Sequence, residues 1–125
     1  MIHGLTYSSH EFDVDYKDYS LSRFLARNGY NVWLLDITGY GQSDPIENGF
    51  IADSNYAAED IHAAVKFISE QNGQRKIDIL GWSWGTVTTN DLIVKVDYDS
   101  FEEIGGNTIF HIGKNTLTLV NQSAD

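Results

Sequence analysis

A serine at position 83 stands between two glycines in the pattern GWSWG, which spans residues 81–85. A mostly apolar run, residues 77–80, precedes it and a helix-compatible segment follows, so Ser83 is predicted at a strand-to-helix turn. Such a turn strains the backbone at the serine, and side chains at Gly81 and Gly85 would collide with neighbouring backbone. The hydroxyl would project outward, and the helix N-terminus behind it favours negative charge. The pattern indicates a nucleophilic serine; a glycine-rich turn with a solvated serine is the alternative.

Acyl transfer by a serine needs a base, because the hydroxyl alone is weakly nucleophilic, and the base is held in place by an acid. His111 is the only histidine after Ser83. We consider it as the catalytic base, and the alternative is a strand histidine that faces solvent or a neighbouring strand. His10 and His62 are interpreted as surface residues.

Helices and strands are predicted to alternate around the serine pattern. Residues 18–28 form a helix with an apolar stripe of Leu21, Phe24 and Leu25, and residues 31–37 form a strand buried on both faces. Residues 56–71 are the clearest helix, residues 76–80 are the next strand, and another helix extends to about residue 95. The face predicted to be buried in the clearest helix consists of Ala57, Ile61, Ala64, Val65 and Ile68. This order favours a parallel sheet covered by helices, with residues 32–37 and 77–80 as adjacent strands.

Residues 96–125 differ in character from the rest of the chain. An acidic segment, 96–103, is followed by two runs, 108–112 and 116–120, that flank a short turn at 113–115. Residues 116–119 alternate polar and apolar side chains, the period of a half-exposed antiparallel strand. We therefore predict a C-terminal β-hairpin and divide the chain into residues 1–95 and 96–125.

The composition is that of a globular chain and argues against several partners. With 18 acidic and 8 basic residues, the net charge of −10 disfavours nucleic acid and anionic membranes. The chain has no cysteine, which excludes disulfides and thiolate metal sites. No membrane-spanning run and no signal peptide is visible, so the location stays open. An acidic group is interpreted as a solvated loop rather than a metal site: Glu11, Asp13, Asp15 and Asp18.

Four features line up along the chain: His3-Gly4, the segment DITGYGQS at 36–43, Asp60, and the serine pattern at 81–85. In this order and spacing they resemble the α/β-hydrolase superfamily over about residues 1–95. Segment 36–43 looks like the family's D-x-R-G-x-G-x-S loop, with Thr38 where arginine is usual. The resemblance implies an α/β fold, a partial α/β-hydrolase three-layer sandwich with parallel strands, to which the C-terminal β-hairpin is added.

The resemblance also implies roles for single residues. Ser83 matches the nucleophile, and the backbone N–H groups of Leu5 and Trp84 match the two donors that stabilise the oxyanion of acyl transfer. His3 matches a structural histidine that orients its loop, so it is not interpreted as the base. Asp36 and Asp60 are interpreted as a loop-bonding and a helix-end carboxylate.

Both ends of the family's sheet are expected to be missing. In the family the catalytic acid and histidine follow the nucleophile on later strands, and each βαβ unit takes about 30 residues or more. Too few residues follow Ser83 for two or three such units, and His111 comes too soon for the family's order. The strand before His3 is reduced to Met1-Ile2. Open sheet edges predict self-association.

The tail, residues 100–125, has a weaker similarity to segments that flank the calcium-binding repeats of RTX-type secreted proteins. The repeat G-G-x-G-x-D itself is absent, so no metal and no cofactor is predicted. The acidic residues before and within this tail are interpreted as a solvated turn, with weak cation binding as the alternative: Asp97, Asp99, Glu102 and Glu103.

The first functional hypothesis is a serine hydrolase of the esterase or lipase type that acts on a small-molecule or lipid ester. A second is a non-catalytic remnant or fusion module that serves as a scaffold or interaction surface. A third is an acyltransferase built on the same serine turn. The triad acid and base that would decide between them are not identified in the sequence.

Overall fold

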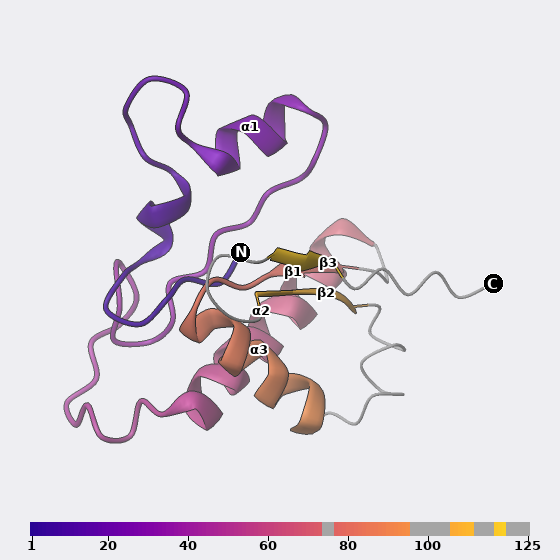
Figure 1. Cartoon of the computed structure of the whole chain (residues 1–125). Coiled ribbons are helices and arrows are strands. Elements are labelled where there is room, and N and C mark those ends of the chain that lie inside the picture. Colours follow the sequence, from indigo (N-terminus) through magenta and orange to yellow (C-terminus); the bar gives the residue numbers. More distant parts are fainter. Residues whose placement is uncertain (74–76, 96–105, 112–116, 120–125) are drawn as a thin grey trace.

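The structure, a computed structural model, describes residues 1–73, 77–95, 106–111 and 117–119. Its elements, in chain order, are η1 (Ser9–Phe12), α1 (Leu21–Arg27), α2 (Ser54–Asn72), β1 (Ile77–Leu80), α3 (Trp84–Lys95), β2 (Gly106–His111) and β3 (Leu117–Leu119). Helices α2 and α3 lie together on one side of the strands and contact each other and β1, whereas α1 lies apart on the other side (Figure 1).

The strands form one sheet in which β1 pairs in parallel with β2, from Ile77↔Gly106 to Leu80↔Ile109. Strand β2 in turn pairs antiparallel with β3. On the other side of β1, Ile2 forms single parallel bridges with both Gly81 and Leu35. The order across the sheet is therefore residue 35, residue 2, β1, β2 and β3.

The prediction that residues 32–37 and 77–80 are adjacent strands is wrong, because Ile2 lies between them. Its N–H donates to Leu80 O at 2.8 Å, and its carbonyl accepts from Trp82 N at 3.0 Å. The strand predicted over residues 31–37 is reduced to a single bridge at Leu35, and the prediction that this run is buried on both faces is also wrong. Trp33 is 37% exposed and Leu34 36%, while Ile37 is fully buried. Among the described helices, α2 and α3 lie on one side of the strands and α1 lies apart, so the segment is not covered on both faces.

Helix α2 confirms the clearest prediction of the sequence. The Asp53 carboxylate accepts from Tyr56 N at 2.9 Å and so caps the first turn, and Gly73 ends the helix with φ of 60°. The predicted face is turned to the core through Ala57, Ile61 and Val65. Together with Ala58, these residues pack in one cluster with Ile2, Ile37, Ile79 and Leu92.

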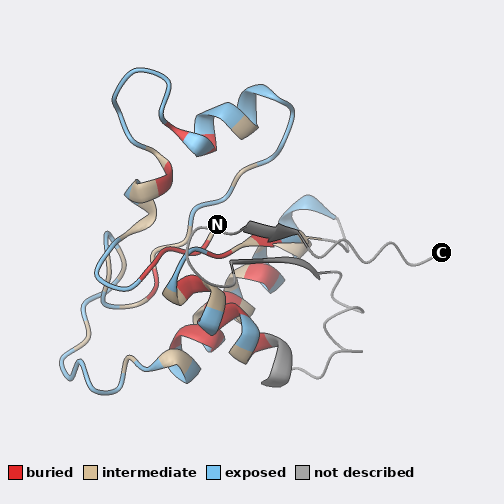
Figure 2. Ribbon diagram, in the orientation of Figure 1, coloured by how far each residue is buried: buried red, intermediate tan, exposed pale blue. Residues whose placement is uncertain are grey.

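Helix α1 is present inside the predicted range but does not bury its apolar stripe. Ser20 caps it, with its hydroxyl accepting from Arg23 N at 3.1 Å. Leu21 is 39% exposed and Phe24 58%. Figure 2 shows the contrast, because α1 is mostly exposed while α2 and α3 carry buried faces toward the sheet. The amphipathic pattern identified the helix, but the described residues supply no partner for its stripe.

The described residues show helices α2 and α3 against the sheet, and the third layer of the predicted sandwich stays a prediction. The segment between β2 and β3 lies outside the described residues, so the C-terminal hairpin and the division at residue 95 also stay predictions. Within the described part of the chain, no helix is long and apolar enough to cross a membrane.

Candidate functional site

Ser83 lies at the turn between β1 and α3 with a left-handed backbone, φ of 52°, and its side chain is exposed. A non-glycine residue in this conformation costs on the order of 1–3 kcal/mol and persists only where its surroundings enforce it. Here Gly85 N donates to Trp82 O at 2.8 Å, and the Thr86 hydroxyl donates to Ser83 O at 2.6 Å. The strained backbone predicted at residue 83 is confirmed.

The two glycines of the pattern are required by close backbone contacts, as the sequence predicted. A Cβ atom at Gly81 would lie 2.7 Å from Gly85 O and 2.9 Å from Thr86 N. A Cβ atom at Gly85 would collide with Ile2 O and lie 2.8 Å from His3 O. Gly85 therefore lets the serine turn pack directly on the segment that begins the chain.

Gly4 brings that first segment over the serine. A Cβ atom at Gly4 would lie 3.2 Å from Ser83 Cβ and 3.3 Å from Trp82 Cδ1. After Gly4 the chain turns back, with Tyr7 N donating to Gly4 O at 3.3 Å and Thr6 at φ of 68°. A positive φ at the third residue is the mark of a type II turn.

His3 is fully buried and fixes the direction of the peptide between Gly4 and Leu5. Its Nε2 accepts from Ile37 N at 3.1 Å, so we assign the ring proton to Nδ1, which donates to Gly4 O at 2.8 Å. In a trans peptide the N–H points opposite to the C=O, so the held Gly4 carbonyl directs the Leu5 N–H away from His3. The geometry agrees with the structural role expected for His3.

The backbone amides of Leu5 and Trp84 are the predicted oxyanion donors. Trp84 directly follows Ser83 in the chain, and Leu5 directly follows Gly4, which packs on Ser83. Trp84 is the first residue of α3, where helix N–H groups have no partner inside the helix. Within the described residues, neither amide donates to a protein acceptor. Their role as oxyanion donors stays a prediction.

Glu11 belongs to this site, although the sequence placed it in a solvated acidic loop. Its Oε1 accepts from Gly4 N at 2.8 Å, and the side chain is half-buried. Burial raises the pKa of Glu11 by more than the Gly4 hydrogen bond lowers it. That interpretation was wrong for Glu11, because a short helical turn, η1, folds its carboxylate back onto the first segment. No sequence motif indicates this contact between Glu11 and Gly4.

Asp36 is a loop-bonding carboxylate, as predicted. Its Oδ1 accepts from Ser9 N at 2.6 Å and its Oδ2 from Gln42 N at 2.9 Å. Partial burial opposes ionisation of Asp36, but the amides of Gln42 and Ser9 outweigh it and hold its pKa below the ordinary value. A Cβ atom at Gly41 would collide with this carboxylate, and Gly41 has φ of 55°.

Asp60 accepts from Thr38 N at 2.8 Å and so ties loop 38–53 to α2. It lies inside α2 rather than at the helix end, which corrects the predicted position. Thr38 stands where the family pattern has arginine, and its backbone N–H, rather than its side chain, makes this contact. Neither Asp36 nor Asp60 is placed to hold a catalytic base, because both bind loop amides.

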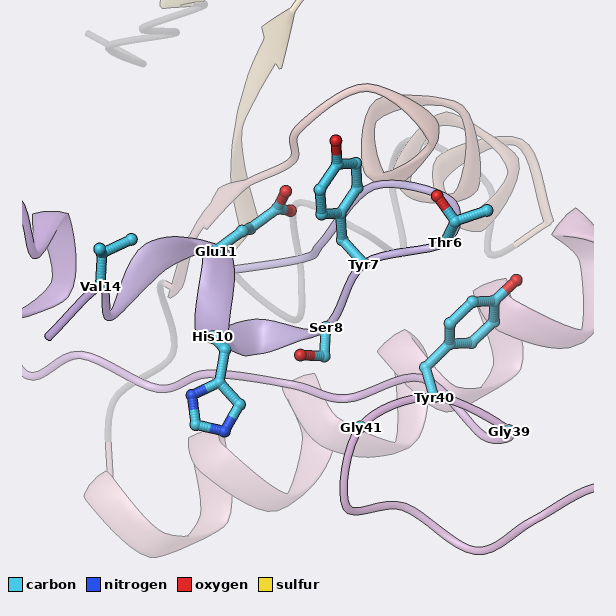
Figure 3. A pocket seen from close by; sticks show the side chains of 9 residues that line it. All are labelled: Thr6, Tyr7, Ser8, His10, Glu11, Val14, Gly39, Tyr40 and Gly41. Carbon is cyan, nitrogen blue, oxygen red and sulfur yellow. The ribbon is translucent and has the colours of Figure 1, made fainter.

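An aromatic cluster links the serine turn to its surroundings. Tyr40 lies between His3 and Trp84, with ring centroids 5.1 Å and 5.7 Å away, and Trp84 Nε1 donates to Ser54 Oγ at 2.9 Å. Tyr40 also lines an open hollow of about 740 Å³ (Figure 3). Its lining consists of Thr6, Tyr7, Ser8, His10, Glu11, Val14, Gly39, Tyr40 and Gly41.

No side chain among the described residues hydrogen-bonds the Ser83 hydroxyl, so the structure assigns no base. His10 is exposed, as predicted, and His62 on α2 is half-buried. Residue 111 is the last of β2, two positions after Ile109, which pairs with Leu80. Because Ser83 follows Leu80 by three positions, both residues come at the carboxyl ends of neighbouring parallel strands. A base at His111 stays a prediction.

The described residues contain no group of three or more metal-ligating side chains. Asp13 binds Arg23 Nε at 2.7 Å and the Ser20 hydroxyl at 2.6 Å, so its carboxylate already has partners. The acidic side chains of the tail lie outside the described residues.

Three comparisons with known proteins bear on this site. A family model described as alpha/beta hydrolase fold matches residues 1–90. Gastric triacylglycerol lipase of Rattus norvegicus is 33% identical over 92 residues, which cover 67% of this chain and 23% of the lipase. The corresponding lipase of Homo sapiens is 30% identical over the same shares. No solved structure matches.

The chain thus spans 23% of the length of the curated relatives that it matches. The family match includes every feature that carried the resemblance: His3-Gly4, segment 36–43, Asp60 and the serine pattern. None of the comparisons supports the weaker similarity of residues 100–125 to repeat-flanking segments.

Proposed function

Because the chain belongs to the alpha/beta hydrolase family, we propose that it carries the nucleophile and oxyanion-binding part of a serine hydrolase. Its substrate is a carboxylic ester, and the reaction passes through an acyl-enzyme. The observation that carries the proposal is the strained, exposed Ser83 between β1 and α3, directly beneath Gly4. An ordinary solvent-exposed serine does not require a left-handed backbone that is held by two close glycine contacts.

In the proposed reaction Ser83 Oγ attacks the ester carbonyl carbon, and its proton passes to a base. The carbonyl oxygen becomes an oxyanion, which accepts from the amides of Leu5 and Trp84. Each such donor is worth about 2.7–4 kcal/mol of transition-state stabilisation. Collapse of the intermediate expels the alcohol, which takes the proton, and water then hydrolyses the acyl-enzyme by the same steps.

His111 is the candidate base, on the grounds of its place at the end of β2 beside the end of β1, and we expect it to be ineffective without an acid to orient it. No carboxylate is assigned as the triad acid, because Asp36 and Asp60 bind loop amides. We therefore propose the 125-residue chain as an incomplete catalyst by itself. The nucleophile and the oxyanion donors are present, whereas the base lacks an identified acid.

The matched relatives are named for triacylglycerol, which makes a lipid or other small-molecule ester the proposed substrate. A non-catalytic scaffold is the second candidate. It is favoured by the fact that no described side chain hydrogen-bonds the Ser83 hydroxyl.

Labelling with a fluorophosphonate separates these candidates, because only an activated serine reacts quickly with it. We expect the folded chain to label faster than the unfolded chain, at a site that maps by mass spectrometry to Ser83 and is lost in Ser83→Ala. Urea-unfolded chain is the control for non-specific reaction. If the folded chain labels no faster than the unfolded chain, the hydrolase proposal fails and the scaffold stands.

A further inference from the structure

Glu11 places a carboxylate on the backbone of the oxyanion segment. Its Oε1 accepts from Gly4 N at 2.8 Å, and the next carbonyl, Gly4 O, accepts from His3 Nδ1 at 2.8 Å. The two peptide groups that flank Gly4 are therefore held by side chains on both sides. Gly4 has no side chain of its own to restrict its torsion angles, so these two contacts hold its conformation together with Tyr7 N, which donates to Gly4 O at 3.3 Å.

We propose that Glu11 is a positioning residue, which holds Gly4 so that the Leu5 N–H stays directed at the substrate oxygen. This inference rests on the proposed function of Ser83 and Leu5. His3 alone fixes only the peptide after Gly4, and the peptide before it needs a second acceptor. The Glu11 side chain supplies that acceptor oxygen at 2.8 Å.

The position of Glu11 is itself well defined. It lies in η1, whose next residue, Phe12, is buried with 5% exposure. The residue after that, Asp13, is bound by Arg23 and by Ser20, the cap of α1. The contacts of Phe12 and Asp13 thus hold η1 in place after Glu11. Before Glu11 in the chain, the Ser9 amide donates to Asp36. The carboxylate can therefore act as a fixed support for Gly4.

The negative charge of Glu11 is not what the proposed role requires. The negative charge of a carboxylate close to a developing oxyanion raises the energy of that oxyanion. What the role requires from Glu11 is only the oxygen atom that accepts the hydrogen bond from Gly4 N. Glutamine keeps an acceptor oxygen at nearly the same place and removes the charge. The proposal therefore predicts opposite outcomes for Glu11→Gln and Glu11→Ala, which separates positioning from a general loss of fold.

The test measures hydrolysis of p-nitrophenyl acetate by the full chain, with the rate of Ser83→Ala subtracted. We expect Glu11→Ala to lower the Ser83-dependent kcat by about 10- to 100-fold with little change in KM, because misplacement of a group by 1 Å can cost 10²-fold. Glu11→Gln should retain the parent rate or exceed it. Glu47→Ala removes an exposed glutamate on loop 38–53 and should match the parent.

The amide proton of Gly4, followed by NMR, gives a readout independent of activity. It should resonate downfield in the parent chain and in Glu11→Gln, and move upfield in Glu11→Ala. A Ser83-dependent rate that Glu11→Ala leaves unchanged overturns the positioning role, whatever the Gly4 signal does. A parent chain without any Ser83-dependent rate overturns the proposed function instead, and this inference with it.

Discussion

At the scale of single residues, the site is organised by backbone contacts more than by side-chain chemistry. His3 connects Ile37 N to Gly4 O through the two nitrogens of one buried ring. That connection ties the segment over the serine to the backbone at residue 37. A buried ring with both nitrogens satisfied has one fixed tautomer, so it acts as a rigid spacer between two backbones.

Gly85 is the residue at which this arrangement is most sensitive to substitution. Gly85→Ala should lower the free energy of unfolding by about 1–3 kcal/mol or more, because the new Cβ would collide with Ile2 O. Urea denaturation followed by tryptophan fluorescence measures the change. Gly49→Ala is the matched control, since a Cβ at Gly49 meets no atom within 4 Å. Equal effects at both positions would contradict the packing argument.

The residues of the site differ in how far sequence could predict them. The strain at Ser83 and the close contacts of its glycines follow from local sterics, so the pattern at 81–85 was sufficient. Glu11 could not be found in this way, because its contact with Gly4 depends on the path of η1 between them. The hydrogen bonds of Asp36 with Ser9 depend on the same path.

At the scale of elements, predictions succeeded where the pattern was long and the packing local. Helix α2 repeats its apolar period over 19 residues and has clear signals at both ends, so its face and limits were predicted closely. The strand order was not predictable in the same way. Met1-Ile2 is too short to show a hydrophobic period. Ile2 is nevertheless the residue that lies between Leu35 and Gly81 in the sheet.

The run at residues 31–37 shows why apolar composition alone misleads. Its side chains are those of a buried strand, but Trp33 and Leu34 remain more than a third exposed. Trp33 packs edge-on against Phe67 of α2, at 6.0 Å between ring centroids, and so covers one side of the segment. Burial depends on what lies on both sides, and a sequence window contains only the segment itself.

The cap of α2 gives a prediction at this scale. Asp53→Ala should lower the free energy of unfolding by about 1 kcal/mol, because it removes the acceptor for Tyr56 N. Asp53→Asn keeps an oxygen in the same place and should stay close to the parent. Urea denaturation of the three proteins provides the measurement. A loss in Asp53→Asn as large as that in Asp53→Ala would show that charge, rather than the cap, is responsible.

At the scale of the whole molecule, the sheet has an edge that the described residues leave open. Leu35 N and Trp33 O both bond to Met1, so the backbone groups of Leu34 between them point to the other side. An exposed strand edge with apolar side chains is a surface for pairing with another chain. The self-association expected from the sequence stays a prediction, and this edge is where we expect it to occur.

Activity of the chain by itself depends on how much of a serine hydrolase these residues contain. A serine turn and oxyanion donors without a working acid–base pair leave a residual rate of roughly 10³–10⁴ over water in serine proteases. The described residues contain the serine turn, and the carboxylates of Asp36 and Asp60 are bound to loop amides. An ordinary turnover would therefore require His111 to act without either of them.

We accordingly expect the purified chain to hydrolyse p-nitrophenyl acetate only at this residual level, and His111→Ala to change the rate by less than about twofold. The reason is that a base lacking its acid cannot hold the tautomer and orientation that proton transfer from Ser83 requires. His10→Ala, at an exposed position, controls for loss of any imidazole. Enzyme-level turnover that disappears with His111 but survives the loss of His10 would mean that the end of β2 completes the site. The acid that orients His111 would then have to be sought in the part of the chain beyond the described residues.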